Sequence, residues 1–130
     1  MSGRPIALGD TSVFIAVEKG RPLLATPPAA LGVSYVTVAE LTVGVLQAPS
    51  PEERVLRSRT LREVQRLRPL PVDRLIAATW AELRTAMREM KRRMPVNDSW
   101  IAATAIAHEL PVVAQDDDYS DVPGLEVIRL

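Results

Sequence analysis

Four acidic residues stand where apolar runs of the chain give way to polar turns or helix starts. They are Asp10, Glu40, Asp98 and Asp116. A carboxylate beside a buried run is unfavourable unless something neutralises it, and a divalent cation held by several carboxylates is one way to do so. The four positions therefore predict a metal site that is assembled by folding.

The composition narrows the chemistry that such a site can perform. The 130 residues contain no cysteine, which excludes disulfides, zinc–thiolate sites and thiol nucleophiles. The single histidine, His108, cannot form a multi-histidine zinc site, and its apolar surroundings favour a helix-end residue over a metal ligand. Carboxylate oxygens remain as ligands, and such hard donors favour Mg²⁺ or Mn²⁺, which commonly serve reactions at phosphate.

Basic and acidic residues are unevenly distributed, although the formal net charge is zero. Residues 54–93 hold twelve of the sixteen Arg and Lys residues and four of the sixteen Asp and Glu residues. Within this stretch Arg84, Arg88 and Arg92 recur every four residues, which predicts a cationic ridge along one side of a helix. The ridge could hold phosphates, pair with an acidic partner, or simply be solvated.

Short apolar segments alternate with helical patterns along the chain. Strands are expected at residues 6–8, 33–35, 112–114 and 127–130. Helices are expected at 13–17, from Thr37 to before Pro49, at 51–67, from Asp73 to about Met94, and from Asn97 or Asp98 to Leu110, with an irregular connection around Pro27 and Pro28. This alternation predicts an α/β sandwich around a mainly parallel sheet, in one domain over residues 1–130.

The predicted architecture gives the four acids a reason to meet. In such sheets, sites form outside the carboxyl ends of the strands, where Asp10 and Asp116 are expected. Asp98 and Glu40 are expected in first turns of helices, where the helix dipole favours a carboxylate. Each acid also has an ordinary explanation: Asp is a preferred cap, and Thr37 with Glu40 fits a capping box, in which the glutamate bonds the amide of the cap residue.

More acids follow the predicted strand at 112–114. Asp116 comes directly after this strand and is assigned to the site, and Asp118 is an auxiliary candidate. Asp117 and Asp121 are expected to face solvent. The acidic run thus contributes one primary and one auxiliary site residue.

Several motifs resemble those of the PIN-domain nucleases, specifically the VapC toxins of bacterial toxin–antitoxin pairs. The matching segments are residues 10–12, residues 39–41 with Gly44, residues 97–105 and residues 113–119. Their order, their spacing and the chain length agree with the family, and the block at 97–105 is the most specific. One departure is Ala114, because many relatives have Thr or Ser two residues before the last acid.

The resemblance implies a three-layer α/β/α fold and a Mg²⁺- or Mn²⁺-dependent endoribonuclease that cuts structured RNA. It makes Asp10, Glu40, Asp98 and Asp116 the catalytic quartet, with all but Glu40 as metal ligands. The auxiliary residues are Asp118, Thr11 and Ser12. The resemblance also implies inhibition by a cognate VapB antitoxin, a homodimer and larger toxin–antitoxin complexes.

The expected reaction is in-line hydrolysis of a phosphodiester, with Glu40 or Asp116 positioning or deprotonating the attacking water. Arg84, Arg88 and Arg92 would contact the RNA or the antitoxin. The alternative is a non-catalytic RNA- or protein-binding module of PIN-like fold, whose acids only cap helices. Aspartyl-phosphate chemistry is disfavoured, because no acid stands two positions after Asp10, where haloacid-dehalogenase-like phosphatases usually have one.

The chain shows no sequence signal for a membrane or for export. No apolar stretch approaches the roughly 20 residues that a membrane-spanning helix requires. The first residues lead into a strand-like run instead of the apolar core of a signal peptide. We therefore expect a soluble cytoplasmic protein without a membrane partner.

Overall fold

The computed structural model describes residues 4–26, 28 and 30–130. Within this part of the chain, one sheet contains the strands β1 (Ala7–Gly9), β2 (Leu31–Gly32), β3 (Val112–Ala114) and β4 (Val127–Arg129). The helices are α1 (Thr11–Glu18), α2 (Tyr35–Leu46), α3 (Pro51–Gln65), α4 (Arg74–Glu89) and α5 (Val96–Ala107). No helix in the described ranges is both long enough and apolar enough to cross a membrane.

The strands lie in the order β2-β1-β3-β4, and every neighbouring pair is parallel. Leu8 of β1 is paired with Gly32 on one side and with Val112 on the other. The backbone N–H of Asp10 continues this ladder by donating to the carbonyl of Val113 at 2.8 Å. Because parallel strands end at the same edge, the residues that follow β1 and β3 lie close together.

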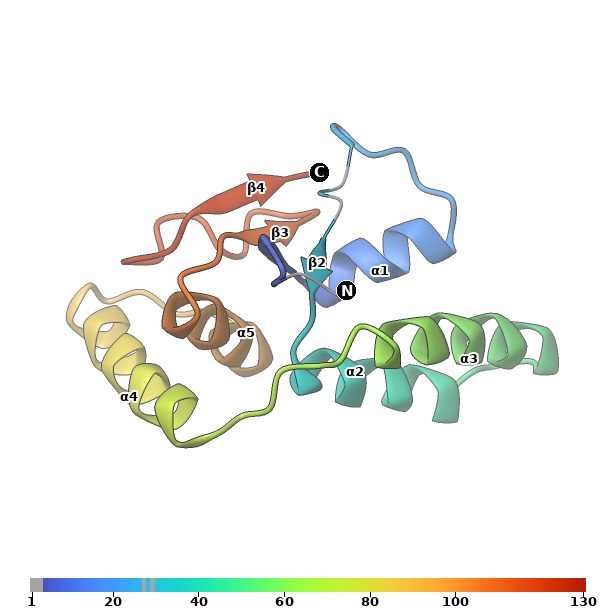
Figure 1. The fold of residues 1–130 in the computed structure, drawn as a ribbon, viewed down its shortest axis with the longest axis horizontal. Coiled ribbons are helices and arrows are strands. Elements are labelled where there is room, and N and C mark those ends of the chain that lie inside the picture. The colour runs from blue at the N-terminus through green and yellow to red at the C-terminus, as the bar shows by residue number, and fades with distance from the viewer. Residues whose placement is uncertain (1–3, 27, 29) are drawn as a thin grey trace.

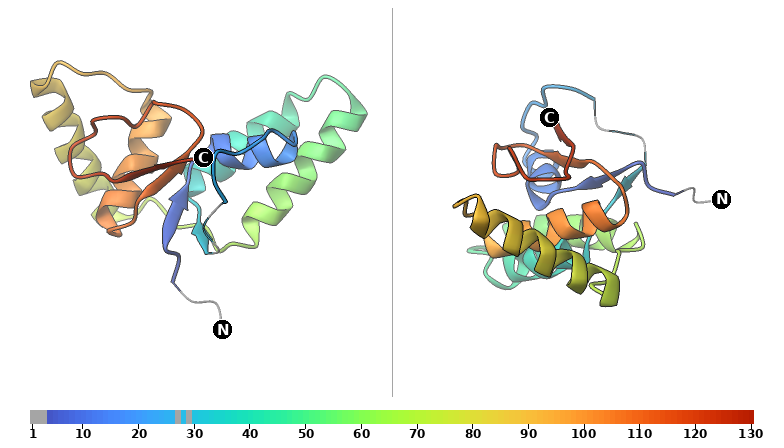
Figure 2. Two further views of the ribbon diagram at one scale, coloured as in Figure 1. Left: turned by 90° about the horizontal axis from the view of Figure 1, so that it is seen from above. Right: turned by 90° about the vertical axis from the view of Figure 1, so that its left-hand side faces the viewer.

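Helices cover both faces of the sheet, as Figures 1 and 2 show. On one face Ala7 and Val113 pack with Val13 of α1. On the other face Leu8 packs in a cluster that includes Ile101 of α5, and α4 packs against α5. The alternation of strand side chains between the two faces explains this burial. The predicted three-layer α/β/α fold with a parallel central sheet is confirmed.

A helical hairpin of α2 and α3 extends from the β2 side of the sheet (Figure 1). Pro51 opens α3, and Ser50 caps it by accepting a hydrogen bond from the N–H of Glu53 at 3.2 Å. The hairpin is joined to the body through a small cluster of Val33, Leu41 and Val64. Seen from above in Figure 2, this hairpin and the α4–α5 pair form two arms that diverge from the strands.

The second strand and the start of α2 differ from the sequence expectation. The strand lies at Leu31–Gly32 instead of residues 33–35, and Tyr35 is already the first residue of α2. Ser34 caps this helix by accepting a hydrogen bond from the N–H of Val36 at 3.0 Å. The expected capping box of Thr37 with Glu40 is therefore wrong, because a serine three residues earlier supplies an equally good cap.

The end of α4 also differs from the sequence expectation, because the chain turns there without a glycine. The helix α4 ends at Glu89 instead of about Met94, and Lys91 adopts a left-handed conformation with φ 56°. The N–H of Arg92 then donates a hydrogen bond to the carbonyl of Met87 at 2.9 Å. This bond satisfies a carbonyl of the last turn that has no partner within the helix. His108 caps the end of α5, as expected, and its side chain is exposed. Of the expected irregular connection, Pro27 lies outside the described residues.

Candidate active site

Asp10 is a buried carboxylate, 5% exposed, that follows β1 and caps α1. Its Oδ2 accepts a hydrogen bond from the backbone N–H of Ser12 at 3.1 Å. Its Oδ1 accepts a hydrogen bond from the hydroxyl of Tyr119 at 2.5 Å. Each oxygen thus has one neutral donor and keeps a further lone pair, so Asp10 is oriented without being neutralised.

Glu40 is held by α1 and not by the start of its own helix. The hydroxyl of Thr11 donates to Oε1 of Glu40 at 2.8 Å. The same Thr11 oxygen lies 3.0 Å from the hydroxyl of Thr37, and both threonines are buried. A glutamate on α2 is thereby tied to the residue directly after Asp10.

Asp98 lies in the first turn of α5, close to several other acids. Burial, followed by the charges of four other carboxylates, raises the pKa of Asp98 from 3.8 to about 7. In decreasing order of effect, these carboxylates belong to Asp10, Asp118, Glu40 and Asp116. We call these five residues, Asp98 included, the carboxylate cluster. Asp98 thus lies within electrostatic range of the other three acids of the predicted quartet and of Asp118.

The segment after β3 is fixed to both α1 and the end of the chain. The N–H of Gln115 donates to Oγ of Ser12 at 3.2 Å, and the Gln115 side chain donates to the carbonyl of Leu130 at 2.6 Å. Asp116 accepts a hydrogen bond from the N–H of Asp118 at 3.1 Å. Burial raises the pKa of the Asp116 carboxyl, and this hydrogen bond acts in the opposite direction. Ser12 therefore positions the segment that carries Asp116.

The two acids expected to face solvent do so. Asp117 is exposed and forms an ion pair with Arg129. The side chain of Asp121 is 89% exposed and lies 3.4 Å from Arg92. Neither Asp117 nor Asp121 is among the charges that raise the pKa of Asp98.

The carboxylate cluster fits a hard divalent cation in its chemistry and its charge. Its members supply only oxygen ligands, and in the described ranges none of them forms an ion pair with Arg or Lys. Across those same ranges, no three carboxylate or imidazole groups converge closely enough to hold one ion between them. A bound cation would relieve the repulsion that raises the pKa of Asp98.

The start of α5 is fixed by a tryptophan on α4. The Nε1–H of Trp80 on α4 donates to Oγ of Ser99 at 2.9 Å, and Ser99 donates to the carbonyl of Val96 at 2.5 Å. The rings of Trp80 and Trp100 are stacked, with centroids 4.3 Å apart. Because Ser99 follows Asp98 directly, these contacts hold the turn that presents the Asp98 carboxylate.

The predicted arginine ridge is only partly a helix face. Arg84 and Arg88 lie on α4, whereas Arg92 lies beyond its end, because the helix stops at Glu89. A hollow of about 830 Å³ opens beside them, and Val96 also lines it. We call it the basic hollow after its cationic residues, which are Arg84, Arg88, Lys91, Arg92 and Arg93. Arg84 lies over the Trp80 ring, 5.5 Å from its centroid.

Comparison with known proteins gives one consistent family. A model of the PIN domain matches residues 7–125. Ribonuclease VapC4 of Mycobacterium tuberculosis is 45% identical over 129 residues, which cover 95% of this chain and 96% of the relative. Ribonuclease VapC5 of the same organism is 46% identical over 135 residues, which cover both chains fully.

A solved structure shows the same fold. It is the crystal structure of VapBC-5 from Mycobacterium tuberculosis, a member of the VapBC family of toxin–antitoxin systems. The TM-score is 0.85 at 42% identity, and the match covers 95% of this chain and 98% of that chain. The sequence likeness and the fold likeness therefore point to the same group of proteins.

The raised pKa of Asp98 predicts a pH-dependent loss of stability in the metal-free protein. Because the folded pKa of about 7 exceeds the 3.8 of an unperturbed Asp, the stability linked to this group is complete below about pH 4 and is lost by about pH 7. The shift corresponds to at most about 4 kcal/mol, and to about 1–2 kcal/mol for a half-exposed, screened group. Asp98→Asn should raise the free energy of unfolding by that amount near pH 8 and leave it unchanged near pH 4.

Urea denaturation of the metal-free protein at both pH values measures this difference. Asp121→Asn is the matched control, because it removes an exposed carboxylate. Its effect on the free energy of unfolding should be small and the same at both pH values. An Asp98→Asn variant that is less stable than wild type near pH 8 would contradict the proposed repulsion.

Proposed function

The chain belongs to the PIN-domain family, and we propose that it is a VapC-type toxin, a metal-dependent endoribonuclease that a VapB-type antitoxin neutralises. The carboxylate cluster carries this proposal, because four acids from distant parts of the sequence lie near enough to Asp98 to raise its pKa, and none of the five is paired with Arg or Lys in the described ranges. The names of the relatives VapC4 and VapC5 as ribonucleases support it. We place the protein in the cytoplasm, where cellular RNA is found.

The residues of the carboxylate cluster would divide the work of hydrolysis between them. Mg²⁺ or Mn²⁺, held by Asp10, Asp98 and Asp116, would lower the pKa of a water molecule and offset the charge that grows on the phosphate. Glu40 has one oxygen engaged by Thr11, which fixes the carboxylate while its other oxygen stays free to accept a proton. Glu40 or Asp116 then positions the attacking water and takes its proton.

The basic hollow is the surface we assign to the RNA. Its five cations surround the end of α4 and the turn that leads to α5, and Val96 at its rim is two residues before Asp98. Among the ion pairs of the described residues, only that of Arg92 with Asp121 involves one of these cations. The other four cations are free to bind phosphates of an RNA whose scissile bond lies at the carboxylate cluster.

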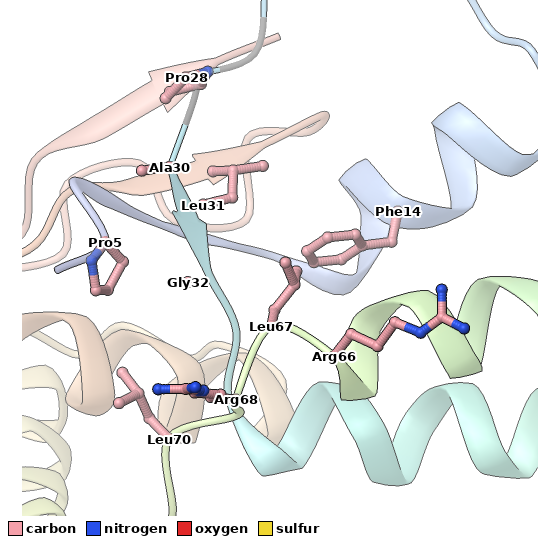
Figure 3. A pocket seen from close by; sticks show the side chains of 10 residues that line it. All are labelled: Pro5, Phe14, Pro28, Ala30, Leu31, Gly32, Arg66, Leu67, Arg68 and Leu70. Carbon is pink, nitrogen blue, oxygen red and sulfur yellow. The ribbon is translucent and has the colours of Figure 1, made fainter. Parts of the chain in front are cut away.

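A different surface suits the antitoxin. Two adjoining hollows of about 540 and 410 Å³ run between α1, α3 and the edge strand β2. Figure 3 shows Phe14 of α1 and Leu67 converging beside β2. We call this surface the apolar groove after the apolar residues Phe14, Val17, Leu31, Leu56 and Leu67 that line it. Charged residues also line the two hollows, namely Glu18, Arg59, Glu63, Arg66 and Arg68.

Exposed apolar side chains distinguish this groove from the RNA surface. Val17 is 59% exposed and Leu67 is 42% exposed, which is unusual for large apolar side chains that share one hollow. An apolar segment of an antitoxin would cover them, as the description of VapBC-5 as a toxin–antitoxin system suggests. The homodimer and the larger toxin–antitoxin complex remain predictions of the family resemblance.

The function is tested by removing charge from the site without changing its shape. Asp10→Asn and Asp98→Asn should each lower Mg²⁺-dependent RNA cleavage by at least about 100-fold, because each variant loses a charged ligand. Asp121→Asn, an exposed acid outside the carboxylate cluster, should cleave like wild type. Sequencing of RNA fragment ends after brief induction measures activity and target together.

This experiment also separates the enzyme from the non-catalytic alternative. An RNA- or protein-binding module would leave the same fragment ends in wild type and in Asp98→Asn. The enzyme would leave new ends in wild type alone, and chelation of divalent cations by EDTA would abolish them in vitro. Equal cleavage by wild type and by both purified variants would reject the proposed site.

Reversing charge in the basic hollow should weaken RNA binding and leave the carboxylate cluster intact. The double variant Arg84→Glu/Arg88→Glu leaves the Arg92–Asp121 ion pair in place. Its Kd for RNA should rise at least about 10-fold, and the slope of log Kd against log salt should become shallower. Arg54→Glu/Arg62→Glu makes the same charge change on exposed positions of α3 and is the matched control. An equal loss of RNA affinity in both double variants would mean that RNA binding depends on the total charge of the protein and not on the basic hollow.

A charged side chain introduced into the apolar groove should weaken binding of the antitoxin and leave RNA cleavage unchanged. Val17→Glu should weaken the binding of a VapB-type antitoxin that neutralises the wild-type toxin, by at least about 10-fold. RNA cleavage by the free toxin should be unchanged, because Val17 lines a hollow to which no member of the carboxylate cluster contributes. Val43→Glu is the matched control, since Val43 is 50% exposed on α2 and lines neither hollow. Retained antitoxin affinity in Val17→Glu would place the antitoxin elsewhere.

A further inference from the structure

A phenol is buried directly beside the candidate metal site. Tyr119 is 0% exposed and packs in the same core cluster as Leu8, Ile101 and Val112. Its hydroxyl donates to Oδ1 of Asp10 at 2.5 Å, and this bond joins residues 109 positions apart in the chain. Sequence reasoning assigned no role to Tyr119, although a tyrosine directly after three acids combines an apolar ring with a polar end suited to such a contact.

The contact does more than satisfy a buried hydroxyl. The terminal torsion of an Asp side chain is soft, so a carboxylate held by one donor can still rotate. In Asp10 the Tyr119 hydroxyl holds Oδ1 and the N–H of Ser12 holds Oδ2, which together fix the plane of the carboxylate. Both donors are neutral, so the negative charge and a lone pair on each oxygen remain available to a cation.

The same bond also fixes how far Asp10 lies from the other acids. Tyr119 belongs to the segment that carries Asp116 and Asp118, two members of the carboxylate cluster. A second link joins this segment to α1, because the N–H of Gln115 donates to Oγ of Ser12. Between them, the two links tie the acids after β3 to the acid after β1.

We propose that Tyr119 is a positioning residue of the metal site, whose hydroxyl orients Asp10 and sets its distance from Asp116 and Asp118. The inference rests on the proposed function, since it concerns the same carboxylates. Tyr119 acts through Asp10 and need not touch the RNA. Its loss should therefore weaken binding of the cation and leave binding of the RNA unchanged.

The test is Tyr119→Phe, which removes one oxygen and keeps the buried ring. Calorimetric titration with Mn²⁺ should show a Kd raised roughly 10- to 100-fold, which is the usual effect of losing a hydrogen-bond partner of a metal ligand. The rise in unfolding temperature with Mg²⁺ should require correspondingly more Mg²⁺. In cleavage assays kcat should fall at limiting Mg²⁺ and recover at high Mg²⁺, while the KM for RNA stays constant.

Tyr35→Phe is the matched control, because it removes the same oxygen from a tyrosine that is 51% exposed at the start of α2. It should match wild type in Mn²⁺ affinity, stability and cleavage. A Tyr119→Phe variant with a lower unfolding temperature but wild-type Mn²⁺ affinity and Mg²⁺ dependence would overturn the inference, since the hydroxyl would then serve only stability. Failure of wild type itself to bind Mn²⁺ would instead overturn the proposed function together with this inference.

Discussion

Repulsion among carboxylates is the constraint on which the organisation of this protein depends. The packing of apolar side chains on both faces of the sheet forces the ends of β1 and β3 together, and with them Asp10 and Asp116. The start of α5 adds Asp98, whose pKa rises to about 7 through burial and, in second place, through the charges of the neighbouring carboxylates. Burial of the core therefore maintains a charge arrangement that would disperse in an unfolded chain.

The chain orients these carboxylates with neutral hydrogen-bond donors. Hydroxyl and backbone N–H groups from Thr11, Ser12 and Tyr119 bind the acids directly, whereas Arg92 and Arg129 form ion pairs with the exposed acids Asp121 and Asp117. An Arg in the same place would hold a carboxylate equally well but would cancel its charge. Neutral donors leave the charge for a divalent cation, which agrees with the chemistry of a PIN-domain nuclease.

The remaining surface separates two kinds of recognition. Cations gather in the basic hollow beside the turn that precedes Asp98, and exposed apolar side chains gather in the groove between α1 and α3. Phosphates of RNA suit the first surface by charge, and an apolar segment of a protein suits the second by its hydrophobic lining. A toxin that must cut RNA and also be neutralised by a protein can thus serve both partners through different residues.

The sequence by itself determined the alternation of strands and helices, the parallel α/β class, the four acids and the lack of cysteine chemistry. These follow from local patterns, because apolar periodicity and capping act over a few residues. It misplaced the start of α2 and the end of α4, since Ser34 and Thr37 are equally good local caps and Lys91 turns the chain without glycine.

Only the tertiary structure decided that Glu40 binds Thr11, that Asp118 joins the acids around Asp98, and that Tyr119 reaches Asp10. Those contacts join residues as far as 109 positions apart, and no local pattern specifies which distant groups the packing of the core will bring within a hydrogen-bond length.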